Sequence, residues 1–236
     1  MAQSKIEWTE ETWNPITGCT KCSDGCEHCY AATFARRLKA MGNPRYTNGF
    51  EVTIHEDLFE LPLSWSKPKL VFVNSMSDLF HEDIPDEVIL RIFSVMNRAS
   101  SHTFQVLTKR SKRLISLSSQ INWTKNIWMG VSLENEKVLF RAEDLKTTNA
   151  YIKFISAEPL LGSLSSLDLS GIDWLIVGGE SGAASRPMEE DWILDLKRKA
   201  NKTGTAFFFK QWGGFNKKKN GKLLKGKIYQ EYPNKR

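Results

Sequence analysis

The sequence predicts a single α/β domain built as a parallel, TIM-like (β/α) barrel that is either partial or nearly complete. Short apolar segments recur along the chain, and amphipathic segments with helical periodicity lie between them. The apolar segments are almost uninterrupted, as strands buried on both faces must be. Alternating strands and helices form parallel sheets through right-handed crossovers. A length of 236 residues suits one such domain with a full core.

Six segments have the strand pattern: residues 69–74, 103–107, 127–132, 151–156, 174–178 and 206–210. A seventh strand is expected at residues 12–17, and a short strand-like run at residues 50–54 interrupts the alternation. Helices are expected at residues 31–41, 85–99, 111–119, 136–145 and 188–202. Because no GxGxxG follows the first strand, a barrel is favoured over the alternative, a doubly wound Rossmann sheet.

The amino terminus carries no apolar region typical of a signal peptide. No segment approaches the roughly 18 consecutive apolar residues that a membrane span requires. We therefore expect a cytoplasmic protein without a membrane partner. Disulfides are rare in that compartment, so a cysteine cluster there indicates metal binding or catalysis. All four cysteines lie between Cys19 and Cys29.

The net charge of +6 is concentrated near the carboxyl terminus. Residues 210–236 contain nine lysines and arginines and a single acid, Glu231, so the rest of the chain is slightly acidic. We therefore divide the chain into a barrel at residues 1–214 and a basic carboxyl-terminal tail at residues 215–236. A local basic patch is typical of a protein that binds a polyanion, although a solubilising tail has the same composition.

Three of the cysteines, Cys22, Cys26 and Cys29, have the spacing C-x3-C-x2-C, and Tyr30 follows the last of them. This pattern resembles the signature of the radical S-adenosylmethionine (SAM) superfamily. The resemblance implies a [4Fe–4S] cluster with three thiolate ligands. The fourth iron is then open to the amino and carboxylate groups of SAM, which is reductively cleaved to a 5′-deoxyadenosyl radical. A barrel fold is expected as well, with the cysteine loop after the first strand.

Cys19 leaves a second interpretation open. With Cys19 included, the spacing becomes C-x2-C-x3-C-x2-C, which four-thiolate zinc sites also use. The alternative function is then a non-catalytic, zinc-stabilised module that binds nucleic acid through its basic tail. The gap of three residues between the two pairs is short for a zinc ribbon, so we favour the three-cysteine cluster. An electron-transfer cluster with four cysteine ligands is a further alternative.

The whole chain resembles a family of short phage- and bacterium-associated proteins that carry the three-cysteine motif and have no known function. The similarity rests on the segments TWNPITGC, NSMSDLFH, LTKR, SAEPLLG, GGESG, SRPM and FFKQWG, which span most of residues 8–214. Spore photoproduct lyase, a radical enzyme of DNA repair, is a more remote analogue by its motif and polyanionic substrate.

Polar residues follow the end of each predicted strand, and in a parallel barrel these ends open on the face that carries the active site. The superfamily resemblance implies that such residues contact SAM. Residues after the second strand are expected to approach the amino group of SAM. Residues after the fourth strand are expected to meet its ribose or carboxylate, and residues after the fifth and sixth strands its adenosyl group or the substrate. The candidates are Tyr30, Asn74, Ser75, Ser77, Asp78, Ser132, Glu134, Glu158, Gly178, Gly179 and Glu180.

Positive and aromatic side chains at the same face are candidate substrate contacts, because phosphate pairs with cations and bases stack on aromatic rings. They are Lys109, Arg110, Arg186, Lys210 and Trp212. We therefore expect modification or repair of a nucleic acid base, a nucleotide or a related precursor, with a peptide substrate left open. An external electron donor such as flavodoxin or ferredoxin is expected, since the chain has no second cysteine cluster.

Overall fold

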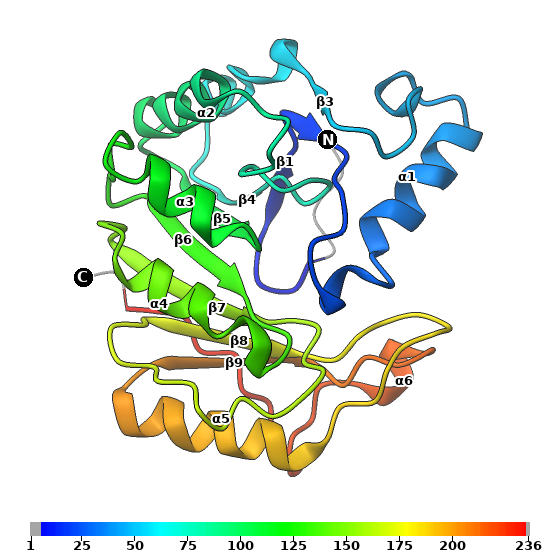
Figure 1. Cartoon of the computed structure of the whole chain (residues 1–236), viewed down its shortest axis with the longest axis vertical. Coiled ribbons are helices and arrows are strands. Elements are labelled where there is room, and N and C mark those ends of the chain that lie inside the picture. Colours follow the sequence, from blue (N-terminus) through cyan, green and yellow to red (C-terminus); the bar gives the residue numbers. More distant parts are fainter. Residues whose placement is uncertain (1–5, 235–236) are drawn as a thin grey trace.

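The computed structural model describes residues 6–234, apart from the side chains of residues 217 and 218. Its main feature is a sheet of seven parallel strands in the order β1-β4-β5-β6-β7-β8-β9. The sheet curls into a half-barrel whose edge strands, β1 and β9, do not pair (Figure 1). The strands are β1 Glu11–Trp13, β4 Leu70–Val73, β5 Thr103–Thr108, β6 Ile127–Ser132, β7 Ile152–Ala157, β8 Trp174–Gly178 and β9 Ala206–Gln211. The predicted partial parallel barrel is confirmed.

The predicted first strand divides into two short strands. Only β1 joins the main sheet, where Trp13 pairs with Val73 of β4. After Asn14 and Pro15 the chain turns, and β2 (Ile16–Thr17) pairs antiparallel with β3 (Thr53–Ile54). Proline lacks the backbone N–H that a central strand needs, so the break at this position has a local cause.

The helices of the described residues are α1 Tyr30–Ala40, α2 Asp86–Arg98, α3 Ser111–Leu117, α4 Phe140–Lys146, α5 Glu190–Thr203 and the short α6 Lys217–Asn220. Helices α2 to α5 lie on the convex side of the half-barrel, whereas α1 follows the cysteine loop and α6 lies beyond the end of β9 (Figure 1). No helix lies between β7 and β8, where residues 158–173 form an irregular connection. Among residues 6–234, no helix is long and apolar enough to cross a membrane.

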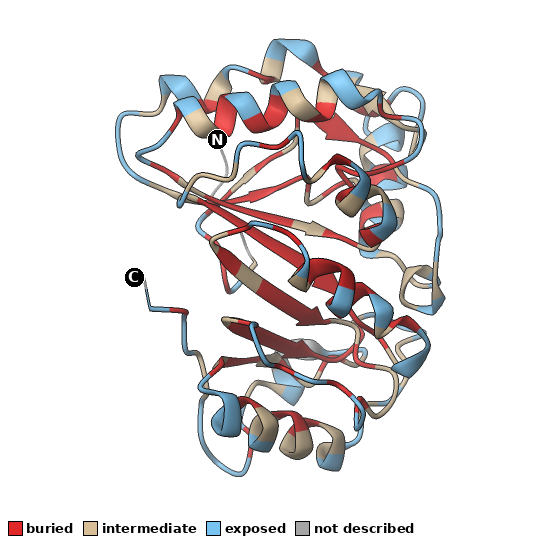
Figure 2. Cartoon of the chain, turned by 60° about the vertical axis from the view of Figure 1, so that its left-hand side comes forward, coloured by how far each residue is buried: buried red, intermediate tan, exposed pale blue. Residues whose placement is uncertain are grey.

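The strands are buried on both faces, which explains their uninterrupted apolar sequences (Figure 2). Val71, Val106 and Val177 belong to the layer between the sheet and the helices. Alternate residues such as Phe72 and Ile176 point into the concave interior. There they pack with Trp8, which the amino-terminal segment inserts into the open side of the half-barrel.

The carboxyl-terminal segment runs antiparallel along the free edge of β9. The amide of Phe209 donates to the carbonyl of Tyr229 at 2.8 Å, and the amide of Glu231 donates to the carbonyl of Phe207 at 3.1 Å. This pairing covers an edge that would otherwise expose unpaired backbone groups. Most of the predicted basic tail therefore contacts the barrel, and its last two residues lie outside the described part of the chain. The division at residue 214 stays a prediction.

Candidate active site

The cysteine loop, residues 18–29, connects β2 to α1 at the carboxyl ends of the parallel strands. Its first residue, Gly18, has a φ of +86°, and a Cβ atom there would lie 2.0 Å from the carbonyl oxygen of Glu51. Only glycine permits this close approach. The amide of Gly18 donates to the carbonyl of Met76, and the amide of Cys19 to that of Phe50. The loop is thus fixed at its start against two neighbouring segments.

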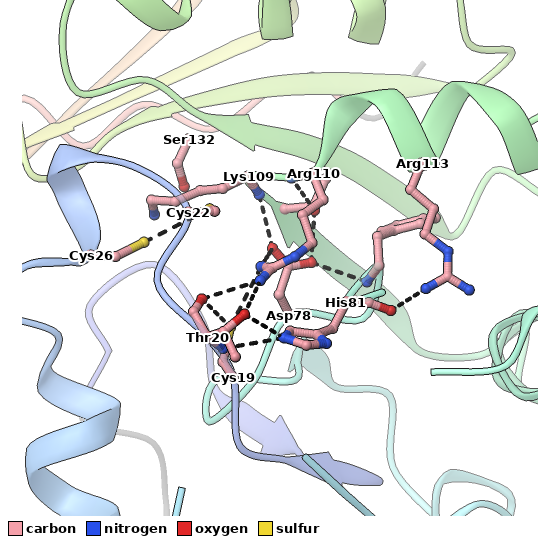
Figure 3. Close-up of polar contacts among 12 residues, drawn as sticks. Cys19, Thr20, Cys22, Cys26, Asp78, His81, Lys109, Arg110, Arg113 and Ser132 are labelled. Carbon is pink, nitrogen blue, oxygen red and sulfur yellow. Dashed lines mark hydrogen bonds and ion pairs between the residues drawn. The ribbon is translucent and has the colours of Figure 1, made fainter. Parts of the chain in front are cut away.

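Two of the three motif cysteines, Cys22 and Cys26, lie in contact within this loop. Cys22 is exposed, and its Sγ lies 3.9 Å from the Sγ of Cys26; Figure 3 shows the two side chains pointing toward each other. A hydrogen bond from Cys22, together with the positive charge of Lys109, lowers the pKa of the Cys26 thiol well below its usual range, although burial opposes this. The thiolate is the form of cysteine that binds metals. Cys29 immediately precedes α1.

The fourth cysteine, Cys19, lines the same cavity and is engaged by a network around Arg110. The Arg110 guanidinium donates to the Sγ of Cys19 at 3.5 Å and to the carbonyl of Thr20 at 3.1 Å. The carboxylate of Asp78 lies 3.2 Å from the same guanidinium (Figure 3). Burial and the Asp78 carboxylate raise the pKa of the Cys19 thiol to about 11. At neutral pH this thiol is therefore protonated.

His81 fixes the next residue of the loop. Its Nε2 lies 2.7 Å from the hydroxyl of Thr20, and its Nδ1 accepts from the amide of Asp83 at 3.1 Å. Burial, aided by the positive charge of Arg110, lowers the pKa of His81, so the ring is neutral at pH 7. The backbone amide of Thr20 also donates to Nε2 at 3.2 Å, so the ring contacts both the amide and the hydroxyl of Thr20.

A second ion-paired network holds the middle of the loop against the segment after β8. Glu180 accepts from the Nδ1 of His28 at 3.0 Å and from the guanidinium of Arg186 at 2.5 Å. Arg186 also donates to the carbonyl of Asp24 and to the carboxylate of Glu27. Burial acts to raise the pKa of Glu180, but the hydrogen bonds from Arg186 and His28 lower it to about 2. The carboxylate therefore stays charged at all physiological pH values.

The cysteine loop forms one side of a cavity of about 390 Å³ at the carboxyl ends of the strands. Of the predicted site residues, those that line it are Cys26, Cys29, Tyr30, Asn74, Ser75, Ser77, Asp78, Lys109, Arg110, Ser132, Glu158, Gly179, Glu180 and Lys210. They come from segments far apart in the sequence and meet because parallel strands present their carboxyl ends together.

Asn74 is the most unusual residue of the cavity wall. Its φ of +59° lies in the left-handed region, and only 3% of its surface is exposed. Neither the nitrogen nor the oxygen of its side-chain amide has a hydrogen-bond partner among the described residues. Leaving a buried polar group unpaired costs about 1–3 kcal/mol. A ligand that supplies both an acceptor and a donor would remove this cost.

The neighbouring hydroxyls are already engaged. Ser75 donates to the side chain of Asn14, and Ser77 donates to the carbonyl of Ile16. The hydroxyl of Tyr30 donates to the backbone carbonyl of Ser75 at 2.5 Å. Asp78 accepts from Thr108 at 2.7 Å and from the amide of Lys109 at 3.0 Å. These groups shape the loops that form the cavity.

Most positive charges at the cavity are paired with carboxylates. Lys210 lies 2.8 Å from Glu158, while Arg110 contacts both Asp78 and Glu82. Lys109 has no ion-pair partner among the described residues, and it lies near Cys26. The free positive charge that the structure brings to the cavity is therefore that of Lys109.

Five predicted site residues do not line the cavity. Cys22 is exposed beside it, and Arg186 lies behind the loop. Glu134 is fully buried, where it pairs with Arg141 at 3.0 Å. Gly178 makes room for the side chain of Glu158, since a Cβ would lie 2.7 Å from its carboxylate. Trp212 donates to the carbonyl of Leu223 and packs on Phe209.

The cavity also contains residues that sequence reasoning missed. Its apolar wall includes Trp8, Phe50, Phe72 and Leu107, and its polar wall includes His28. His28 lies inside the cysteine motif, and this position could have marked it as a candidate site residue. Phe50 and Trp8 carried no such signal, because they come from an excursion and from the amino-terminal segment rather than from strand ends.

Similar proteins share this fold. Spore photoproduct lyase complexed with dinucleoside spore photoproduct superimposes with a TM-score of 0.51 at 13% identity, covering 86% of this chain and 64% of that one. A mutant of the same enzyme with bound AdoMet and the dinucleoside gives a TM-score of 0.50 at 12% identity, with the same coverage. The chain thus spans about 64% of the length of these relatives.

Comparison of the sequence with known protein sequences gives a single family. No curated protein sequence is significantly similar to this chain. One family model matches residues 3–233, which is nearly the whole length. That family is described as a protein of unknown function, DUF5131, and the chain belongs to it.

Proposed function

We propose that this protein is a radical SAM enzyme whose [4Fe–4S] cluster is held by Cys22, Cys26 and Cys29. The observation that carries the proposal is the position of the three-cysteine loop beside a cavity at the carboxyl ends of seven parallel strands. The similarity of the fold to spore photoproduct lyase, which has been solved with AdoMet, supports it.

The residues present fit a cluster and SAM. The donor set is three soft thiolates, the ligands that iron–sulfur clusters prefer. Cys19, by contrast, accepts a hydrogen bond from the buried Arg110, which favours three ligands over four. The unpaired amide of Asn74 offers a donor and an acceptor to the polar end of SAM. When bound, the cluster and SAM supply a 5′-deoxyadenosyl radical.

The chain itself orients these groups and excludes water. The Arg110 network holds the start of the cysteine loop and the Glu180 network holds its middle, so the segment that carries Cys22 and Cys26 is fixed at both of these points. Lys109 stabilises negative charge on Cys26. Trp8, Phe50 and Phe72 form an apolar wall. Such a wall would keep water away from the radical that the cluster and SAM supply.

We infer that the substrate is a nucleic acid base or nucleotide. Support comes from Lys109, which has no carboxylate partner among the described residues, from the basic carboxyl-terminal segment and from the dinucleoside bound by the lyase. A base within a duplex would enter the cavity after leaving its stack, because the reacting atoms of a stacked base are out of an enzyme's reach. The exposed position of Cys22 suits electron delivery from an external donor such as flavodoxin or ferredoxin.

Anaerobic reconstitution with iron and sulfide tests the radical chemistry. The expected protein is brown, absorbs near ~400 nm as thiolate-ligated clusters do, contains about four irons and forms 5′-deoxyadenosine from SAM and dithionite. Cys22→Ala should lose the cluster, whereas Cys19→Ala should keep it. A colourless protein that binds zinc and loses it in both variants would instead support the zinc-stabilised module. A protein with four irons that never forms 5′-deoxyadenosine would exclude radical chemistry.

A further inference from the structure

The chain from Gly213 to Gly221, here called the lysine loop, projects beyond the end of β9 and contains α6. Its ends meet, because the amide of Trp212 donates to the carbonyl of Gly221 at 3.1 Å. The side chain of Asn220 donates to the carbonyl of Gly213 at 2.9 Å, and that of Asn216 accepts from the amide of Lys219. These bonds make the loop a closed, internally braced unit rather than a loose connection.

The lysine loop is attached directly to the cavity wall. The amide of Gly214 donates to the carbonyl of Glu180 at 2.7 Å, and the amide of Gly182 donates to the carbonyl of Gly214. Glu180 and the following Ser181 both line the cavity. Figure 1 shows α6 on the same side of the molecule as α1, which follows the cysteine loop. The lysine loop therefore stands at the rim of the candidate active site.

Phe215, near the start of this loop, has 81% of its surface exposed. Burying a phenylalanine side chain stabilises a protein by about 1.5–3 kcal/mol, and the fold gains none of this here. Three consecutive lysines, at positions 217–219, follow it in the sequence, and Lys219 is exposed. An exposed aromatic ring on a braced, cationic loop is suited to a partner that offers both flat apolar faces and negative charge.

We propose that the lysine loop binds a single-stranded segment of nucleic acid, with Phe215 stacked on a base and Lys219 beside its phosphates. Single-strand binding sites combine these two features, because every base has a stacking face and every nucleotide a phosphate. This inference rests on the proposed function: the base to be modified occupies the cavity, and the strand next to it lies across the rim.

The test uses the reconstituted full chain and a fluorescein-labelled single-stranded DNA of twelve nucleotides with mixed sequence, with binding followed by fluorescence anisotropy. Base stacking on one aromatic ring is worth about 1–3 kcal/mol, so Phe215→Ala should weaken binding by roughly 5- to 100-fold. Phe215→Tyr should restore it. Met41→Ala is the matched control, since Met41 is 79% exposed and lies at the far end of α1, and it should leave the affinity unchanged.

Salt dependence separates the roles of the ring and the lysines. Phe215→Ala should keep the wild-type slope of log Kd against log salt concentration, whereas Lys219→Gln should reduce that slope by about 0.7. Equal affinity of Phe215→Ala and wild type would overturn the inference. So would a wild-type protein that does not bind the strand, or a Phe215→Ala variant whose only defect is slower reduction by flavodoxin.

Formation of 5′-deoxyadenosine without DNA, measured on the same preparations, distinguishes this inference from the proposed function. Its presence together with unchanged DNA binding by Phe215→Ala would refute the role of the lysine loop alone. Its absence would refute the radical chemistry, on which the assignment of the strand depends.

Discussion

The concave interior of the half-barrel has two contrasting ends. Toward the amino ends of the strands it is filled by rings: Trp174 lies within 6.2 Å, centroid to centroid, of Trp8, Trp128, Phe154 and Phe208. Toward the carboxyl ends it opens into the cavity, where polar strand ends meet an apolar wall and the amide of Asn74 has no partner among the described residues. The same face of one sheet thus supplies stability at one end and binding groups at the other.

The two ends are held together by different kinds of interaction. Removing water from the aromatic end stabilises the fold without directional contacts. The polar end, by comparison, is held by ion pairs between distant segments, such as Arg110 with Asp78 and Arg186 with Glu180. Substitutions at the first end should change stability, and substitutions of unpaired groups at the second should change ligand binding instead.

The largest expected effect follows from Trp174→Ala at the aromatic end. Removing a fully buried tryptophan should lower the free energy of unfolding by about 3–5 kcal/mol, measured by urea denaturation. Trp174→Phe, which keeps most of the packing, should cost clearly less. If the alanine variant were as stable as wild type, the aromatic end would not be the stabilising half of the interior.

Asp78→Asn should have the next largest effect, because it removes one charge of a buried ion pair. A loss of ~3 kcal/mol is expected by urea denaturation, with a lower iron content after reconstitution, since Arg110 holds the cysteine loop. Glu56→Gln is the control, as its pair with Arg91 is exposed on both sides and should matter by less than about 1 kcal/mol. Equal losses in the two variants would contradict this reading.

Asn74→Gly tests the polar end directly. Glycine tolerates the positive φ and removes an unpaired amide, so stability should change by less than about 1 kcal/mol. Loss of the amide contacts should raise the KM for SAM roughly tenfold, measured by 5′-deoxyadenosine formation. Ser75→Ala should leave the KM unchanged because that hydroxyl binds Asn14. An unaltered KM in Asn74→Gly would place SAM elsewhere.

The smallest effect concerns acid stability. The pKa of Glu180 is lowered from 4.5 to about 2 in the folded protein. Its stabilising contribution is therefore complete above pH 4.5 and is lost as the pH falls toward 2. The metal-free Glu180→Gln variant should lack this portion of the pH dependence of the urea midpoint, whereas the exposed Glu87→Gln should retain it. Identical profiles for all three proteins would show that the Glu180 network does not stabilise the fold.

Much of the fold was predictable because strands buried on both faces have an unmistakable composition. All six apolar runs became strands, and their polar followers Asn74, Lys109 and Glu158 do meet at one cavity. The predicted first strand was too long, although Pro15 within it was a visible warning. Glu134 and Trp212 also follow strands, but neither lines the cavity. Glu134 pairs with Arg141, and Trp212 packs on Phe209.

By itself the sequence determined what is local: the spacing of Cys22, Cys26 and Cys29, the alternation of strands and helices, and the lysines of the carboxyl-terminal segment. Only the tertiary structure decided which polar groups are paired and which are free. His28 and Glu180 meet across 152 positions of sequence, and Cys19 and Arg110 across 91. A side chain's hydrogen-bond partners depend on such long-range contacts, so no local pattern distinguishes the unpaired Asn74 from its engaged neighbours.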